Sequence, residues 1–279
     1  MKRTTIGLIV VIALIFFAIM LVCVQVTKNV NETEGLSEGC QQDGRRHVIA
    51  LNEHHLHNSS MLVAERFPYV AAITRNASTL WPFSCFACVV LSRWIVTAAH
   101  CRHSGSHHRV ILFHDFAFNQ SYTFPIQLWR IHEKYNTSHP SPKYDIAAAR
   151  LNLDEYPYVL KPAVFDESEA IHVEASIWKT VSTMDKRLYL TNHFERYYLK
   201  IVNSDRCFET FGIVLDESLI CVDMSNYDSC FVHEFGPIFS EEKLVGILAV
   251  KPQDCDTKLS IFTNISYYTN WILRTTHEG

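Results

Sequence analysis

WIVTAAHC, at residues 94–101, joins an apolar run to a turn of small residues that carries a single histidine. The run Trp94–Thr97 is rich in β-branched side chains, which predicts a buried strand. The two alanines that follow leave room for a tight turn, and this turn presents the imidazole of His100 beside Cys101. A lone histidine in such a place is more often an ordinary surface or core residue. Whether His100 has a chemical function therefore depends on the rest of the chain.

A second motif gives this histidine a partner. Tyr144-Asp145-Ile146-Ala147 follows His100 by about forty-five residues. With both motifs, the chain resembles the chymotrypsin/trypsin family of serine proteases over residues 46–276. The resemblance implies that a buried Asp145 accepts a hydrogen bond from the imidazole of His100 and fixes its tautomer. An isolated Asp-Ile-Ala would be a strand edge, and retention of Asp145 for packing alone stays open.

The same resemblance implies an all-β fold. It consists of two packed six-stranded antiparallel β-barrels with a cleft between them and a C-terminal helix. Phe67–Ile73 is the expected first strand, and Val89–Val96 is typical of a hairpin. Tyr268, Trp271 and Ile272 stand at helical spacing in the predicted terminal helix.

The stretch that should hold the family's nucleophile departs from the pattern. Residues 228–237 (DSCFVHEFGP) align without gaps to Asp-Ser-Cys-x-Gly-Asp-Ser-Gly-Gly-Pro. Glu234 stands at the serine position, His233 at the family's carboxylate, and Val232 and Phe235 at two of its glycines. A carboxylate is a poor nucleophile toward an amide. It also puts negative charge where an oxyanion would form, a place where one donor contributes about 2.7–4 kcal/mol. The resemblance therefore implies a remnant site that lacks catalysis.

Two further family features are altered. The family's cleavage-generated N-terminus, Ile-Val-Gly-Gly, should fall near Leu56, but the chain reads His-Leu-His-Asn there. In GILAVK at residues 246–251, Lys251 takes the place of a glycine at the mouth of the specificity pocket, and Val250 replaces a tryptophan of its wall. Asp228 matches the base of a trypsin-type pocket. With Lys251 at the mouth, we expect Asp228 to be paired or solvated rather than substrate-binding.

The cysteines form a possible disulfide framework. The resemblance implies three bridges: Cys85–Cys101, Cys207–Cys221 and Cys230–Cys255. Cys40 and Cys88 could bridge the segment before the domain to the domain itself, or either could be free. Cys23 lies in an apolar N-terminal segment, where it is either palmitoylated or unmodified.

The N-terminal segment predicts a membrane anchor. Ile6–Val26 is almost wholly apolar and follows Lys2 and Arg3. At about 1.5 Å per residue it can span a bilayer core of roughly 30 Å, and the basic residues favour a cytosolic N-terminus. We predict a cytosolic tail at 1–5, a transmembrane signal anchor at 6–26, an extracellular stalk at 27–46 and a degenerate protease domain at 47–279. A single-pass type II protein results; secretion after signal cleavage is the alternative.

Other features bear on partners. The net charge of −4 argues against a nucleic-acid partner, and no cofactor is expected. The histidine-rich stretches 53–57 (EHHLH) and 102–108 (RHSGSHH) could bind zinc. They lack a helical i, i+4 pair of ligands, so we predict solvated loops and no metal. Six Asn-x-Ser/Thr sequons predict a glycosylated surface, at Asn31, Asn58, Asn76, Asn119, Asn136 and Asn264.

These observations favour an inactive serine-protease homologue that binds a protein partner, as yet unknown, at the cell surface or in the extracellular space. If Glu234 reaches His100, two carboxylates would flank one imidazole and raise its pKa. A residual hydrolase that uses His100 and Asp145 with Glu234 is the alternative. A purely structural surface glycoprotein is a third possibility.

Overall fold

The computed structural model describes most of the chain from residue 67 onward. The described residues are 67–76, 80–115, 120–138, 141–153, 160–165, 171–182, 187–225, 236–252, 254 and 256–277. The predicted anchor at 6–26, the predicted stalk at 27–46 and residues 228–235 of the nucleophile stretch lie outside them. Among the described residues, no helix is long and apolar enough to cross a membrane.

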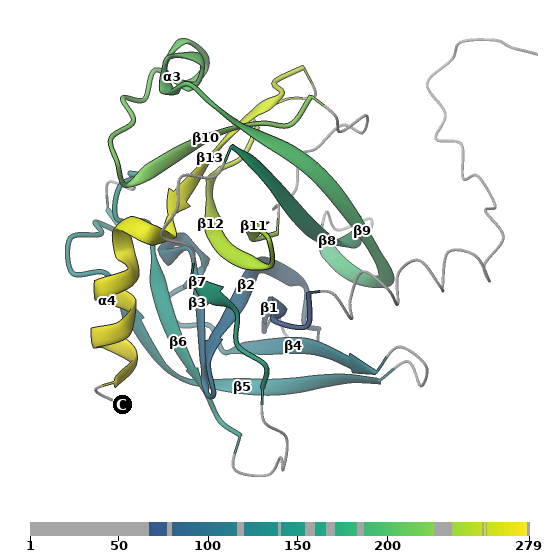
Figure 1. Ribbon diagram of the computed structural model, residues 1–279. Coiled ribbons are helices and arrows are strands. Elements are labelled where there is room, and N and C mark those ends of the chain that lie inside the picture. Colours follow the sequence, from purple (N-terminus) through teal and green to yellow (C-terminus); the bar gives the residue numbers. More distant parts are fainter. Residues whose placement is uncertain are drawn as a thin grey trace, which may run out of the picture. The chain divides into compact units, whose positions relative to one another are not determined.

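The first half of the domain is a closed antiparallel barrel. Its strands pair in the order β1-β2-β3-β6-β5-β4 (Figure 1). Their bounds are β1 Val70–Arg75, β2 Phe83–Leu91, β3 Trp94–Thr97, β4 His108–Asp115, β5 Gln120–Ile131 and β6 Ala147–Leu151. Three successive alanines of β6, Ala147–Ala149, are fully buried, so this strand packs closely inside the barrel.

The second half is also a ring of six antiparallel strands. The sheet order β11-β8-β9-β10-β13-β12 is closed by the pairing of β11 with β12, and the short β7 adds parallel to the start of β12. The bounds are β7 Val164–Phe165, β8 His172–Ser182, β9 Leu188–Val202, β10 Leu219–Asp223, β11 Ile238–Ser240, β12 Lys243–Val250 and β13 Leu259–Asn264. The prediction of two six-stranded antiparallel barrels is therefore confirmed.

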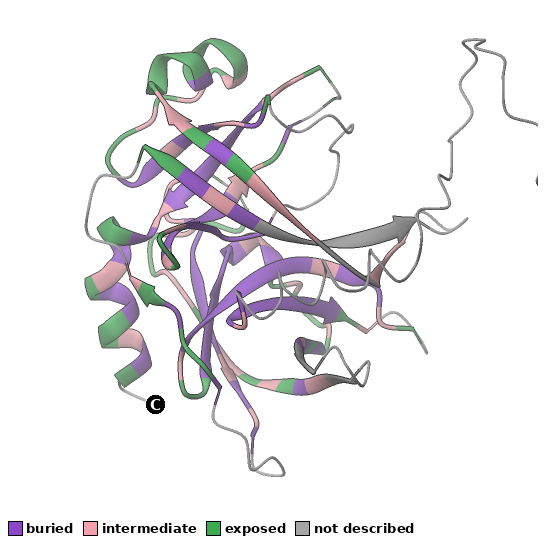
Figure 2. Ribbon diagram, turned by 45° about the vertical axis from the view of Figure 1, so that its right-hand side comes forward, coloured by how far each residue is buried: buried purple, intermediate pink, exposed green. Residues whose placement is uncertain are grey.

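Each described helical segment follows the end of a strand. A 3-10 turn, η1 (Ala99–Cys101), follows β3; α3 (Ser204–Phe211) follows β9; and α4 (Ile265–His277) ends the described chain. The predicted C-terminal helix is confirmed, and its face with Tyr268, Trp271 and Ile272 is buried (Figure 2). Asn264 caps this helix, because its Oδ1 accepts a hydrogen bond from the N–H of Ser266 at 3.2 Å.

One apolar core extends through both barrels. At one contact, the ring of Phe239 in β11 lies 5.3 Å from that of Phe67 and 4.9 Å from that of Tyr69, measured between centroids. The hydroxyl of Tyr69 also donates to the carbonyl of Glu242 at 3.0 Å. The first barrel therefore packs against the hairpin that follows the nucleophile stretch.

That β11–β12 hairpin turns through two residues in an unfavourable backbone conformation. Ser240 pairs with Lys243, and between them Glu241 and Glu242 have φ angles of 49° and 68°. Two-residue hairpin turns of this kind favour asparagine and glycine, because other L-residues crowd their Cβ against the backbone at positive φ.

We therefore expect Glu241→Asn with Glu242→Gly to raise the free energy of unfolding by roughly 1 kcal/mol. Urea unfolding would measure this change. The matched control is Glu241→Gln with Glu242→Gln. It removes the same two charges but keeps long side chains at the two positions with positive φ angles. Equal stabilisation in both variants would show that charge, and not backbone strain, is responsible.

Candidate functional site

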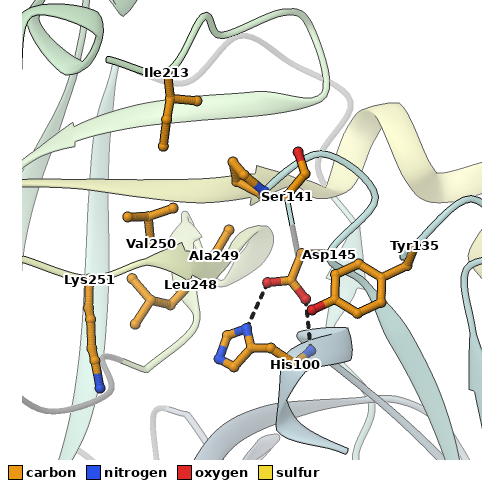
Figure 3. A pocket seen from close by; sticks show the side chains of 10 residues that line it. His100, Tyr135, Ser141, Asp145, Ile213, Leu248, Ala249, Val250 and Lys251 are labelled. Carbon is orange, nitrogen blue, oxygen red and sulfur yellow. Dashed lines mark hydrogen bonds and ion pairs between the residues drawn. The ribbon is translucent and has the colours of Figure 1, made fainter. Parts of the chain in front are cut away.

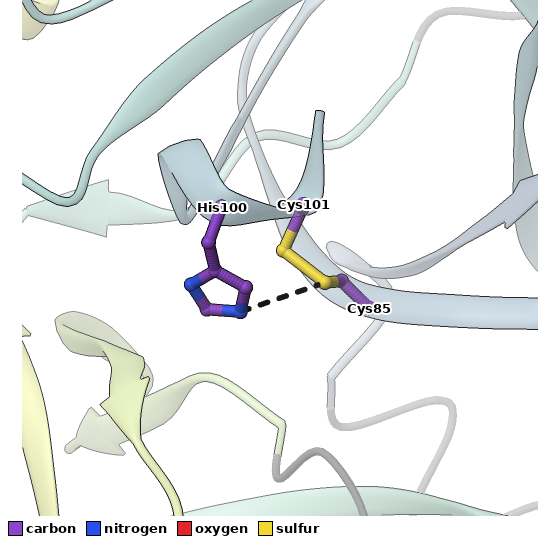
Figure 4. Close-up of side chains that lie close together, drawn as sticks. All are labelled: Cys85, His100 and Cys101. Atoms are coloured by element: carbon purple, nitrogen blue, oxygen red, sulfur yellow. Dashed lines mark hydrogen bonds between the residues drawn. A yellow bond between two sulfur atoms is a disulfide. The ribbon is translucent and has the colours of Figure 1, made fainter. Parts of the chain in front are cut away.

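The histidine motif folds as its pattern predicts. All four residues of β3, Trp94–Thr97, are buried, and η1 follows directly. A disulfide between Cys85 of β2 and Cys101 fixes this turn to the neighbouring strand, the pairing that the family resemblance implies. Nε2 of His100 lies 3.9 Å from the sulfur of Cys85 (Figure 4).

His100 and Asp145 meet in a two-point contact. Nδ1 of the imidazole lies 2.7 Å from one carboxylate oxygen, and the backbone N–H of His100 donates to the other at 2.9 Å (Figure 3). Asp145 is only 3% exposed. Because an ionised carboxylate accepts and cannot donate, the ring proton at this contact belongs to Nδ1. Nε2 is then the nitrogen with a lone pair, as in the family's catalytic pair.

The second barrel and α4 hold the aspartate in place. Tyr144, directly before Asp145, has a φ of 67°, and its N–H donates to the hydroxyl oxygen of Tyr268 at 3.1 Å. The hydroxyl of Thr263 in β13 donates to the carbonyl of Asp145 at 3.2 Å. The ring of Tyr144 also stacks on His132, with centroids 4.9 Å apart. These contacts fix the backbone on either side of the carboxylate.

A cavity of about 440 Å³ opens beside this pair and is lined from both barrels. The first barrel supplies His100, Tyr135, Ser141, Pro142 and Asp145, and the second supplies Ile213, Leu248, Ala249, Val250 and Lys251 (Figure 3). Aliphatic side chains form most of the wall on the second barrel. Burial and the charge of Asp145 raise the pKa of Tyr135 to about 12, so this phenol stays protonated.

An ion pair joins the two halves near this cavity. Lys143, from the loop before Asp145, pairs with Asp216, from the segment after α3. The Asp216 carboxylate also accepts from the backbone N–H of Ser218 at 3.0 Å. Both charged groups are more than one third exposed, so the pair contributes little to stability. The pair joins the segment of Pro142 to the segment of Ile213, and both of these residues line the cavity.

The other cysteines divide into two groups. Cys207 of α3 is bonded to Cys221 of β10, again as the resemblance implies. Cys88 is a buried free thiol, and burial raises its pKa. Of the two alternatives for Cys88, the structure therefore has the free thiol. The proposed partners Cys230 and Cys255, together with Cys40 and Cys23, lie outside the described residues.

Several predicted site residues also lie outside the described part of the chain. They are Glu234, Asp228 and the sequons Asn31, Asn58 and Asn119. Lys251 is exposed and lines the cavity. Of the described sequons, Asn136 is exposed, Asn76 is half-buried, and Nδ2 of Asn264 donates to the carbonyl of Glu217 at 2.8 Å.

Sequence reasoning missed four residues of the cavity wall, namely Tyr135, Ser141, Pro142 and Ile213. Tyr135 and Ile213 come from loops that carry no motif. Gly212, which caps α3 in the left-handed conformation, is the one local signal near Ile213, and it marks the end of a helix rather than a site. Their place in the cleft follows from the packing of the two barrels.

The histidine-rich stretch after η1 is partly buried. Nε2 of His108 accepts from the backbone N–H of His103 at 3.3 Å, and Nδ1 of His103 lies 3.1 Å from the carbonyl of Cys101. Among the described residues, one group has metal-ligand proximity, namely Cys85, His100 and Cys101. Its two sulfur atoms are joined in the disulfide, so neither is available as a thiolate.

His108 makes stability depend on pH. Burial, followed by the charges of His103, Arg75 and Arg102, lowers its pKa to about 4, whereas an unfolded histidine titrates near 6.5. Between these values the unfolded chain binds more protons than the native chain. The contribution of the neutral His108 to the free energy of unfolding is therefore fully present above about pH 6.5 and is lost as the pH falls toward about 4.

We expect His108→Gln to flatten this dependence, because glutamine can accept the same hydrogen bond without titrating. Thermal unfolding measured from pH 7 to pH 4.5 would compare the two slopes. Each melting temperature is compared with the value of the same protein at pH 7, so a loss of stability that is the same at every pH cancels. If the melting temperatures of both proteins fall equally as the pH is lowered, His108 is not the source of the pH dependence.

Comparison with known proteins agrees with this geometry. The family model described as Trypsin matches residues 59–272. Collagenase of Hypoderma lineatum is 25% identical over 82% of this chain and 90% of its own length. Human kallikrein-5 is 24% identical over 75% of this chain and 72% of its own. The structure of mouse neuropsin, a serine protease, superposes with a TM-score of 0.60 at 24% identity, covering 75% of this chain and 95% of that one. The chain belongs to the trypsin family of serine proteases.

Proposed function

We propose that this chain is a trypsin-family protein without peptidase activity, and that it acts by binding a protein partner at the cleft. The observation that carries the proposal is Glu234 at the family's serine position. The alignment there rests on Gly236 and Pro237, which match the family and lead directly into β11. It also rests on Cys230, six residues before Gly236.

The chemistry of the pair supports the proposal. The contact between Nδ1 of His100 and Asp145 leaves Nε2 as the base that would take a proton from a nucleophile. With a glutamate in place of serine, there is no hydroxyl proton to take. A carboxylate at this point also repels the charge that develops on a carbonyl oxygen during acyl transfer.

Binding of a partner does not require a nucleophile, only the walls of the cavity. The cavity offers aliphatic wall residues, such as Leu248 and Val250, beside the polar groups of His100 and Lys251. Mostly apolar concave sites with a few convergent polar groups are the usual places for ligand binding. A segment of a protein partner is the ligand that we propose for this site.

The rival function is a residual hydrolase, and the intact His100–Asp145 pair favours it. Such an enzyme would use Glu234 and His100 together as an acid–base pair on an ester or on water. A nucleophile and its base act as a unit, so the loss of one member removes nearly all of the rate. We therefore place this function second.

The test is labelling by a fluorophosphonate probe, together with turnover of a panel of peptide and ester substrates, on the purified full-length chain. We expect neither labelling nor turnover. Glu234→Ser serves as the companion variant, and it shows whether the remaining site can be activated by a hydroxyl. Turnover by the native chain that disappears in His100→Ala would establish the hydrolase and overturn the proposal.

We also propose that the chain is a glycosylated, single-pass type II membrane protein, anchored by residues 6–26 with its domain outside the cell. The apolar segment and the six sequons support this placement. In transfected cells, we expect the chain to stay with membranes through alkaline carbonate extraction and to lose mass after treatment with an N-glycosidase. A shortened chain in the medium would establish secretion instead.

A further inference from the structure

The cavity presents no carboxylate of its described lining to a ligand. Among the described residues that line it, Asp145 is the one carboxylate, and it is 3% exposed. Both of its oxygens accept hydrogen bonds from His100, so this group is already satisfied within the protein. The phenol of Tyr135 has a pKa of about 12 and is therefore uncharged at neutral pH. Negative charge thus contributes little to this surface.

Lys251 gives positive charge to one end of the cavity. It is exposed, and it lines the cavity directly after Val250, the last residue of β12. Figure 3 shows Val250 between Lys251 and Ile213, with the ammonium group of Lys251 directed away from Ile213. The neighbouring ion pair of Lys143 with Asp216 adds no net charge. A ligand in the cavity therefore meets a cation at the end where Lys251 lies.

The wall beyond Val250 is apolar and continues onto the surface of the protein. Leu248 and Ile213 line the cavity, and Val214, the residue after Ile213, is 79% exposed. Concave sites that bind ligands usually combine such apolar walls with a few polar groups that fix the orientation of the ligand. The cavity therefore has two chemically different ends, one cationic and one aliphatic.

We propose that the partner segment bound in the cleft is acidic at one position and apolar beside it. Its carboxylate lies against Lys251, and its apolar side chains pack on Val250 and Ile213. This inference rests on the proposed function of the cleft and names the chemistry of the ligand. Complementary charge across an interface selects partners and suppresses those of the wrong sign. A trypsin-type pocket with Asp228 at its base would instead select a basic side chain, so the two arrangements predict opposite preferences.

The test measures the affinity of the purified full-length chain for three labelled peptides by fluorescence anisotropy. The peptides share two leucines and a tryptophan and differ at one position, which carries glutamate, glutamine or lysine. Two sets place this position before or after the apolar residues. We expect the glutamate peptide to bind about 10-fold more tightly than the lysine peptide, because an ion pair with Lys251 favours the first and repulsion disfavours the second. The difference should shrink as salt rises from about 0.1 M to about 1 M, since the screening length falls from about 10 Å to about 3 Å.

Variants of Lys251 test whether this residue sets the preference. Lys251→Gln should abolish the preference, and Lys251→Glu should reverse it, so that the lysine peptide binds more tightly. The matched control is Lys161→Glu, which changes the net charge as much as Lys251→Glu does, through an exposed residue that does not line the cavity. This control should keep the native preference. Thermal unfolding confirms that each variant is folded, and movement of the NMR signals of the His100 ring locates the bound peptide at the cleft.

The outcomes separate this inference from the proposed function. Binding at the cleft with equal affinity for all peptides, or a preference that survives in Lys251→Glu, overturns the inference and leaves the proposed function standing. Tighter binding of the lysine peptide by the native chain also overturns it and assigns the selection to Asp228. Cleavage of a peptide by the native chain overturns the proposed function, whichever peptide binds more tightly. Failure of every peptide to bind overturns the binding role of the cleft and the inference with it.

Discussion

Burial of one carboxylate organises this molecule. Asp145 is almost fully enclosed, and an enclosed charge is stable only where hydrogen bonds replace water. Its oxygens therefore accept from the ring and from the backbone of His100. These two contacts tie the loop before β6 to η1, and thereby fix both the direction of the imidazole and its tautomer.

The same contact links the two barrels. The hydroxyl of Thr263 in β13 donates to the carbonyl of Asp145, and the hydroxyl oxygen of Tyr268 in α4 accepts from the backbone N–H of Tyr144. The second half of the domain therefore positions a residue of the first. Removal of one member of a buried charged contact leaves the other uncompensated. This gives the pair a structural role that does not depend on a nucleophile. Its geometry by itself is therefore no evidence of catalysis.

The two barrels give the cavity walls of different character. The first barrel lines the cavity mainly with polar residues, and the second barrel lines it with four aliphatic residues and Lys251.

The sequence by itself determined the local structure: the strand and turn at WIVTAAHC, the β2–β3 hairpin, the buried face of α4 and the change of the nucleophile to Glu234. Each of these depends on residue type over a few neighbouring positions. The tertiary structure alone decided that Tyr135 and Ile213 share a cavity, and that Cys88 is enclosed as a free thiol. These relations depend on strand register and on the packing of one barrel against the other. They join residues far apart in the chain, which no local pattern records.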